Sequence, residues 1–256
     1  MEEDVEELAR YLLHKLDCTP AAQRLIVGIA GIPASGKSTF SHLLVERVNS
    51  LLRERWVTNS TTSGETPANI QNASGDIGFP EHEQAILVGL DGWHLSRAQL
   101  DLLPDPRTAH DRRGIHWTFD GAAYITFLKK VRDTSFAGVI TAPSFDHALK
   151  DPTLDAVSIH PYHRIVIIEG LYVFLSIPPW SEGGLLLDER WFIEVDKAEA
   201  RRRLAVRHVL TGITENTIEA EKRADLNDLP NGEFIVSNLL KPTRVIQSKP
   251  ISTSVR

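Results

Sequence analysis

The chain has 256 residues, which is enough for one α/β domain with a sizeable core or for two small domains. Its 28 Lys and Arg and 34 Asp and Glu give a net charge of −6, which argues against binding nucleic acid or a membrane through a polybasic surface. The single cysteine, Cys18, excludes an intrachain disulfide and fits a reducing compartment. No apolar run approaches the roughly 18 residues of a membrane helix. The acidic N-terminus is unlike a signal peptide, so we expect a cytoplasmic protein.

The first third of the chain is predicted to form a helix, a strand and a second helix. Apolar residues at helical spacing predict an amphipathic helix over residues 3–17, within an N-terminal segment at 1–20. The apolar run RLIVGIAG predicts a buried strand, and helical spacing resumes over residues 37–56. Residues 57–83 are rich in Ser, Thr, Asn and Gly and have no apolar period, so we expect a flexible insertion there.

The rest of the chain alternates short apolar strands with helices. Strands are predicted at 85–90, 138–145, 164–168 and 190–196, with a weaker candidate in TRVIQS and with the second strand entering a loop. Helices are predicted at 120–133, 197–212 and 214–228, and the last one should end before Pro230. This alternation predicts one α/β domain over residues 1–256, with a doubly wound, mostly parallel sheet and helices on both faces.

The segment GIPASGKS, residues 31–38, matches the pattern G-x-x-x-x-G-K-[ST] between a predicted strand and a predicted helix. Its glycines permit backbone conformations that side chains would block, so the loop N–H groups can converge on phosphate oxygens at a helix N-terminus. Lys37 adds a positive charge toward the β- and γ-phosphates. The motif therefore predicts a site for ATP and Mg²⁺. The residues expected to bind ATP are Gly31, Ile32, Pro33, Ala34, Ser35, Gly36, Lys37, Ser38 and Thr39.

Two carboxylates directly follow predicted strands: Asp91 ends AILVGLDG and Glu169 ends RIVIIEG. Ligands of open parallel sheets bind beyond the carboxyl ends of the strands, so both acids should lie near the phosphate loop. We expect Glu169 to act with Ser38 as a Mg²⁺ ligand, as a Walker-B acid does. Asp91 should accept the proton of a substrate hydroxyl, with Glu169 as the alternative base. Either carboxylate could instead be a simple turn or cap residue.

Two other classes of enzyme find little support in the sequence. The segment from Asp111 to Gly114 matches D-x-x-G, but no strand precedes it, and no Asn-Lys-x-Asp motif for reading a guanine base occurs. The G-x-S-x-G elbow of serine hydrolases is also absent from the sequence. These patterns argue against a GTPase and against a Ser-His-Asp hydrolase.

Six segments, taken together and in this order along the chain, indicate a protein family: GIAGIPASGKST, GLDGWHL, DRRGIHWTFD, APSFDH, VIIEGLYVFL and EARRRLAVRHVLTG. Over about residues 24–247, leaving out the insertion, the chain resembles the phosphoribulokinase/uridine kinase family of P-loop kinases. That family includes bacterial-type pantothenate kinases, and the nucleoside- and sugar-kinase-like branch is most similar. The resemblance implies a P-loop NTPase fold with an Arg-containing lid at 197–228. It also implies an ATP-dependent kinase that phosphorylates a hydroxyl of a nucleoside, sugar or pantothenate-like alcohol.

The resemblance also implies roles for particular residues. Asp91 matches the family's catalytic base, and Arg203 and Arg207 match lid arginines that close over the triphosphate, although both could simply form a solvated face. Asp120 matches an acid that binds sugar hydroxyls, and it could equally cap the following helix. The residues expected to contact the acceptor are Trp93, His94, Asp120, Phe145, Asp146 and His147.

The acceptor itself stays open. Uridine kinases carry a Tyr-Asp-Phe type loop where this chain has SFDH, and their lid arginines have another spacing. A kinase of a phosphorylated sugar is one alternative, because Arg112 and Arg113 could bind the acceptor phosphate. A non-catalytic ATP-binding regulatory protein is another. The sequence leaves the oligomeric state undecided, with a homodimer as one option.

Overall fold

A computed structural model of the chain describes residues 2–62, 83–146 and 148–249. Within these residues, five parallel strands form a central sheet in the order β2-β5-β1-β6-β7. Their bounds are β1 Leu25–Gly31, β2 Ala85–Gly89, β5 Ile165–Glu169, β6 Glu189–Glu194 and β7 Arg244–Gln247. Strand β1 is buried along its whole length, as expected for a parallel strand covered on both faces.

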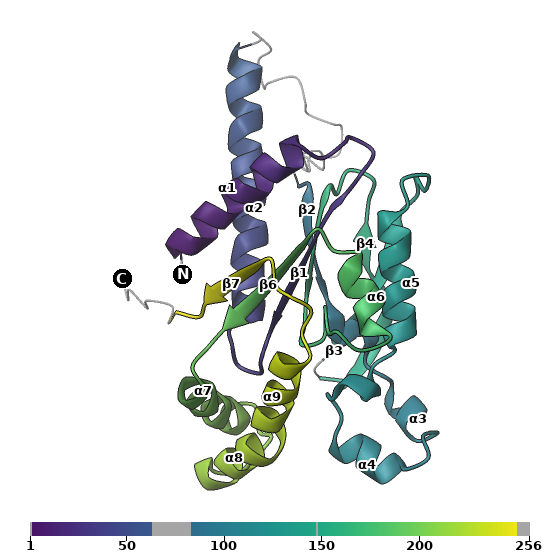
Figure 1. Ribbon diagram of the computed structural model, residues 1–256, viewed down its shortest axis with the longest axis vertical. Helices are drawn as coiled ribbons and strands as arrows, with labels where there is room; N and C mark the ends of the chain where they lie inside the picture. The colour runs from purple at the N-terminus through teal and green to yellow at the C-terminus, as the bar shows by residue number, and fades with distance from the viewer. Residues whose placement is uncertain (1, 63–82, 147, 250–256) are drawn as a thin grey trace.

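Helices cover both faces of this sheet (Figure 1). Helices α1 (Glu2–Asp17) and α2 (Lys37–Thr62) pack on one face, where the core contains Val27 and Ile29 of β1. Helices α5 (Gly121–Arg132) and α6 (Trp180–Leu185) cover the other face, against Ile26 and Ala30. The alternation along β1 thus divides the core into two layers, and the predicted α/β fold with a parallel sheet is confirmed.

An antiparallel hairpin, β3 (Ile140–Asp146) with β4 (Asp151–Ile159), lies beside the main sheet. The prediction had residues 138–145 leading from a strand into a loop and contained no second strand. Strand β4 was missed because most of its side chains are exposed and only Val157 and Ile159, near its end, reach the core, so DPTLDAVSI shows no sustained apolar alternation. The register shifts between Ala142 and Ser144, where Pro143 cannot donate a ladder hydrogen bond.

Short helical segments connect β2 to α5 on the side of the hairpin. A 3₁₀ turn at Leu90–Trp93 follows β2, and another at His116–Thr118 precedes α5. Between these turns lie α3 (Arg97–Leu100) and α4 (Pro106–Asp111). The described part of the chain contains no helix with both the length and the apolar character that crossing a membrane requires.

Two predicted helix ends are wrong. Helix α2 continues to Thr62, so residues 57–62 of the predicted insertion are helical, and residues 63–82 lie outside the described residues. The last turns of α2 read VTNSTT, which has no apolar period to signal a helix.

The second wrong end concerns the helical region after α7 (Lys197–Leu210). It runs through α8 (Thr217–Arg223), a π-helical turn at Ala224–Asp228 and α9 (Leu229–Ser237), so Pro230 lies inside it. The π turn directs the N–H of Leu229 to the carbonyl of Ala224, and Pro230 then falls in the first turn of α9, where a missing N–H is tolerated.

A buried carboxylate anchors α1 to the sheet. Glu189 accepts hydrogen bonds from Tyr11 Oη at 2.7 Å and from Trp191 Nε1 at 3.1 Å, and it also pairs with Lys15 and Thr243. Burial alone would raise the pKa of Glu189, but these partners together lower it to about 2. Helix α1 is thus held to the sheet by the hydrogen bond and ion pair that Tyr11 and Lys15 form with Glu189, in addition to its apolar contacts.

Candidate active site

The loop between β1 and α2 has the shape that its glycines predict. Ala34 and Gly36 have φ values of 62° and 88°, in the left-handed region. A Cβ at Gly31 would lie 2.5 Å from Ser35 Oγ and 2.9 Å from the Ile193 carbonyl oxygen, so only glycine fits there. The loop ends where α2 begins, and the N-terminus of this helix favours a bound phosphate.

Lys37, Ser38 and Glu169 meet at the end of β1. In the sheet register Ile29 lies opposite Glu169, so β5 places its last residue beside the loop. Lys37 Nζ is 3.8 Å from Glu169 Oε1, and the Glu169 side chain is only 14% exposed. Burial raises the pKa of Glu169, although Lys37 and a hydrogen bond from Ser38 partly oppose this. This carboxylate would therefore be stabilised by an additional cation.

Asp91 follows β2, the neighbour of β5, and its side chain is 49% exposed. The 3₁₀ turn that carries it is held on its far side by the hairpin. A Cβ at Gly92 would lie 2.2 Å from the carbonyl oxygen of Pro143 in β3, so the turn and the hairpin backbone are in direct contact. The carboxylate position is thus determined by backbone packing.

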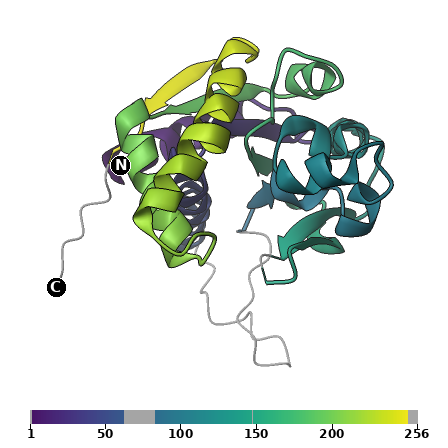
Figure 2. The same cartoon turned by 90° about the horizontal axis from the view of Figure 1, so that it is seen from below.

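These residues line one cavity of about 880 Å³. The phosphate loop and the Asp91 turn form its base. One wall comes from the lid region of α7, α8 and α9, and the opposite wall from the segment around Arg112 and from the hairpin. Figure 2 shows these two groups of elements on either side of the sheet edge. The volume lies in the range of small-molecule sites, so the cavity has room for ligands of that size.

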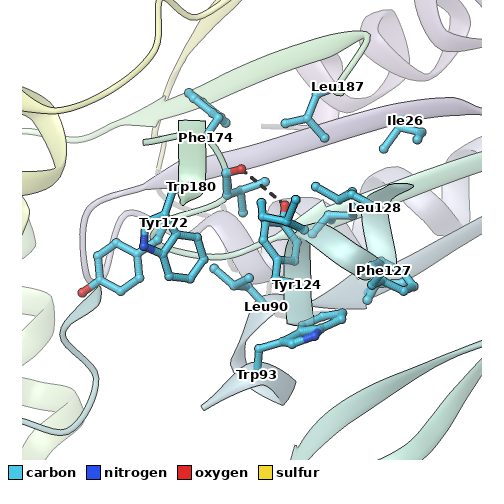
Figure 3. Packing of buried hydrophobic residues seen from close by; sticks show 14 of the residues in the cluster. Ile26, Leu90, Trp93, Tyr124, Phe127, Leu128, Tyr172, Phe174, Trp180 and Leu187 are labelled. Atoms are coloured by element: carbon cyan, nitrogen blue, oxygen red, sulfur yellow. Dashed lines mark hydrogen bonds between the residues drawn. The ribbon is translucent and has the colours of Figure 1, made fainter. Parts of the chain in front are cut away.

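The predicted acceptor residues fall into two groups. Phe145 lines the cavity, and the His94 ring packs on it with 4.7 Å between centroids. Trp93, by contrast, is 5% exposed and packs between Tyr124 and Phe127 in the core (Figure 3). Trp93 therefore supports the Asp91 turn from inside the protein and does not line the cavity.

Two other predicted acceptor residues, Asp120 and Asp146, do not line the cavity. Asp120 caps α5 by accepting a hydrogen bond from the N–H of Ala123 at 2.9 Å. Asp146 accepts from the N–H groups of Ala148 and Leu149 at the hairpin tip. His147 lies outside the described residues.

The predicted lid arginines take different positions. Arg203 donates to the Ala34 carbonyl at 3.3 Å and to Ser248 Oγ at 2.8 Å, so it touches the phosphate loop directly. Arg207, one turn further on, lines the cavity. Arg201 and Arg202 pair with carboxylates of the lid itself, as expected for a solvated face.

Sequence reasoning missed two pairs in this region. The Tyr172 hydroxyl donates to the Gly114 carbonyl at 2.7 Å and lies 2.9 Å from Asn231 Oδ1, and Asn231 lines the cavity. His208 Nε2 lies 2.9 Å from Asp228 Oδ2 and connects α7 with the π-helical turn. No spacing in the sequence connects the members of either pair. One member of each pair, Asp228 and Asn231, lies in the short segment NDLPNGEFI, and their nearness in the sequence was the available signal.

Comparisons with known proteins point to one class of enzyme. The chain is 47% identical over 153 residues to the ATP-dependent kinase-like protein notR' of Aspergillus versicolor. The aligned region covers 59% of this chain and 89% of that protein. The chain is also 33% identical over 234 residues to a Schizosaccharomyces pombe protein provisionally named uridine kinase C227.14, with 90% and 86% covered. The crystal structure of the P-loop-containing kinase YFH7 of Saccharomyces cerevisiae matches with a TM-score of 0.76 and 25% identity, covering 96% of this chain and 99% of that chain. No protein-family model matches the chain.

Fold, site and relatives together define an ATP-dependent P-loop kinase that acts on a small molecule. Within that class, the chain belongs to the phosphoribulokinase/uridine kinase-like family. The family that the six sequence segments predicted is thereby confirmed.

Proposed function

We propose that the protein transfers the γ-phosphoryl group of ATP to a hydroxyl group of a small-molecule alcohol, with Asp91 as the general base. One observation above all supports this proposal. The half-exposed carboxylate of Asp91 lines the same cavity as Lys37 and Glu169, on a turn that the hairpin backbone holds in place. A positioned proton acceptor beside a phosphate site is what transfer to an alcohol requires.

In the proposed reaction the acceptor oxygen forms a bond to the γ-phosphorus. The bond from that phosphorus to the β–γ bridging oxygen breaks, and ADP leaves with the electron pair. The hydroxyl proton passes to Asp91. The loop amides and Lys37 hold the phosphates, while Arg207 faces the developing charge from the lid and Arg203 holds the loop through Ala34.

The same site fits Mg²⁺. Magnesium prefers oxygen ligands and is usually held by one or two protein groups together with substrate phosphates. The Ser38 hydroxyl and the buried Glu169 carboxylate supply such oxygens. Burial raises the pKa of Glu169, so a cation bound beside it would stabilise the charged form. When bound, Mg²⁺ would neutralise charge on the transferring phosphate.

Several further expectations belong to the same proposal. Residues 1–256 would act as one cytoplasmic kinase domain, with 197–228 as its lid, and the contact of Arg203 with the phosphate loop supports that lid. Phe145 and Asn231 would contact the acceptor, because both line the cavity that Asp91 also lines. The relative named as a uridine kinase makes nucleosides one class of alcohol to test.

The test is a screen for acceptor-dependent ADP release over nucleosides, sugars, sugar phosphates, pantothenate and glycerate. We expect Asp91→Asn to lower kcat by about 10²- to 10⁴-fold, the usual contribution of a general base, with little change in ATP binding. Lys37→Ala should also abolish turnover. Asp101→Asn is the matched control, because Asp101 is an exposed carboxylate that pairs with His110 and does not line the cavity. Full turnover by Asp91→Asn would refute the base assignment. A lack of stimulation by every alcohol would refute phosphoryl transfer and leave a protein that only binds ATP.

A further inference from the structure

Unpaired positive charge collects in the cavity. Almost every arginine side chain in the described ranges donates to a carboxylate or carbonyl oxygen or lies within 4 Å of a carboxylate. Those without such a partner there are Arg107, Arg112, Arg207 and Arg223, and all of these except Arg107 line the cavity. The ammonium group of Lys150, which also lines the cavity, has no carboxylate within 4 Å among the described residues.

These cations come from two opposite walls. Arg207 and Arg223 belong to the lid, whose Arg203 contacts the phosphate loop. Arg112 follows α4, and Lys150 lies at the tip of the hairpin. Figure 2 shows the hairpin and the short helices before α5 on the opposite side from the lid helices. We assign Arg207 and Arg223, on the lid, to the nucleotide. The positive charges of Arg112 and Lys150, on the opposite wall, need another explanation.

Arg113 anchors the second wall around Asp91. Its guanidinium donates to the Leu95 carbonyl at 2.7 Å, to Asp151 Oδ1 at 2.9 Å and to the Lys150 carbonyl. These bonds connect the segment after α4 to the chain that leaves the Asp91 turn and to the hairpin tip. The hydrogen bonds of Arg113 are thus used to hold the fold together. They also keep Arg112 and Lys150 on the cavity wall opposite the lid.

The charge balance of the cavity differs from that of the whole chain. Its lining has six Lys and Arg against four Asp and Glu, although the chain carries a net charge of −6. Glu169 already pairs with Lys37, and Asp228 pairs with His208. The other two acids of the lining, Asp91 and Asp111, form no ion pair within 4 Å with Arg112 or Lys150. A neutral acceptor would leave these two cations without a paired carboxylate, whereas an anionic group could bind both.

We propose that the acceptor alcohol carries an anionic group, a carboxylate or a phosphate, which Arg112 and Lys150 bind while its hydroxyl faces Asp91. This inference rests on the proposed phosphoryl transfer and narrows its substrate class. Ile115 and Phe145, which line the same wall, contact the carbon skeleton between the two ends.

The test compares alcohols in pairs that differ in the anionic group. ADP release is measured with glycerate against glycerol, pantothenate against pantothenol, and ribose 5-phosphate against ribose. We expect the anionic member of at least one pair to have a kcat/KM at least tenfold above its neutral partner, and the pair that responds identifies the anion as a carboxylate or a phosphate. In Arg112→Gln and in Lys150→Gln this ratio should fall by roughly tenfold to a hundredfold, mainly through KM, because a charge-assisted hydrogen bond is lost.

Arg107→Gln is the matched control. Arg107 is also exposed and unpaired among the described side chains, and it lies on α4 but outside the cavity, so the ratio should stay at the wild-type value. Neutral acceptors that react as well as their anionic partners would overturn this inference and leave phosphoryl transfer intact. An Arg112→Gln ratio equal to that of wild type would also overturn it. No turnover with any alcohol would overturn both proposals.

Discussion

Replacing Gly92 by alanine tests whether backbone packing sets the position of Asp91. Gly92 follows the proposed base directly, and its Cα faces the backbone of β3. An added Cβ would lie 2.2 Å from the Pro143 carbonyl oxygen, 2.5 Å from the carbonyl carbon and 3.0 Å from the Ser144 nitrogen. All three atoms belong to the backbone, so no side-chain rotation can relieve the contact.

The size of the effect follows from these distances. Carbon and oxygen atoms rarely approach within about 3.2 Å without bonding, so the turn or the hairpin must move by about 1 Å. Overpacking of this kind costs about 1–3 kcal/mol of the free energy of unfolding. A misplacement of about 1 Å at a catalytic group can lower the rate about a hundredfold. We therefore expect Gly92→Ala to lose both stability and kcat.

Gly89→Ala is the matched control. Gly89 lies three residues earlier, at the end of β2, with φ of −82° and ψ of 126°, and a Cβ there would have no neighbour within 4 Å. Alanine fits this conformation, so the variant should unfold at the same urea concentration as wild type or be about 0.4–1 kcal/mol more stable. Urea unfolding followed by circular dichroism gives the stability, and ADP release with the best acceptor gives kcat.

The result that would refute this reasoning is a Gly92→Ala variant that matches Gly89→Ala in both measurements. A variant that loses stability but keeps kcat would show that the hairpin supports the fold without positioning Asp91.

Two further predictions concern pH and stability. The pKa of Glu189 lies near 2 in the folded protein, below its usual 4.5. Its contribution to the free energy of unfolding is therefore complete above pH 4.5 and is lost as the pH falls toward 2. Glu189→Gln should thus cost about 2–3 kcal/mol at neutral pH in urea unfolding, with a difference from wild type that shrinks in acid, and a constant difference would contradict the assignment. Burial lowers the pKa of His163 from 6.5 to about 4, so the unfolded chain binds the proton first and stability falls as the pH drops through that window. His163→Asn can still accept the 2.9 Å hydrogen bond from the His160 N–H. The variant should lose up to roughly 3 kcal/mol less stability than wild type as the pH falls from 6.5 to 4. The same loss of stability in variant and wild type over this range would exclude His163 as the source.

The strands of the main sheet could be predicted because parallel strands buried on both faces are continuous apolar runs, such as RIVIIE at β5. The phosphate loop and the two strand-end acids followed from those strands, since parallel strands end at one edge. Strand β4 had no such signal, because its side chains are mostly exposed and it is held by pairing with β3.

Other parts of the site depend on contacts that a linear pattern does not contain. Trp93 follows Asp-Gly and suggested a ligand wall, but the 3₁₀ turn rotates its ring into the core against Tyr124. The contact between Tyr172 and Asn231 joins two segments whose spacing has no period. The hydrogen bonds of Arg113 to the carbonyl oxygens of Leu95 and Lys150 likewise appear only once the hairpin is folded.

The place of β1 in the sheet has a consequence for how the protein forms during synthesis. Its neighbours are β5 and β6, so Leu25 pairs with Ile165 and Val27 pairs with Glu189. The ribosome therefore makes the phosphate loop long before either strand that flanks it exists. Contacts so distant in sequence close slowly and leave apolar strands exposed in the meantime. We expect nascent chains that end before residue 165 to need chaperone protection and to lack nucleotide binding, although they already contain the whole GIPASGKS segment.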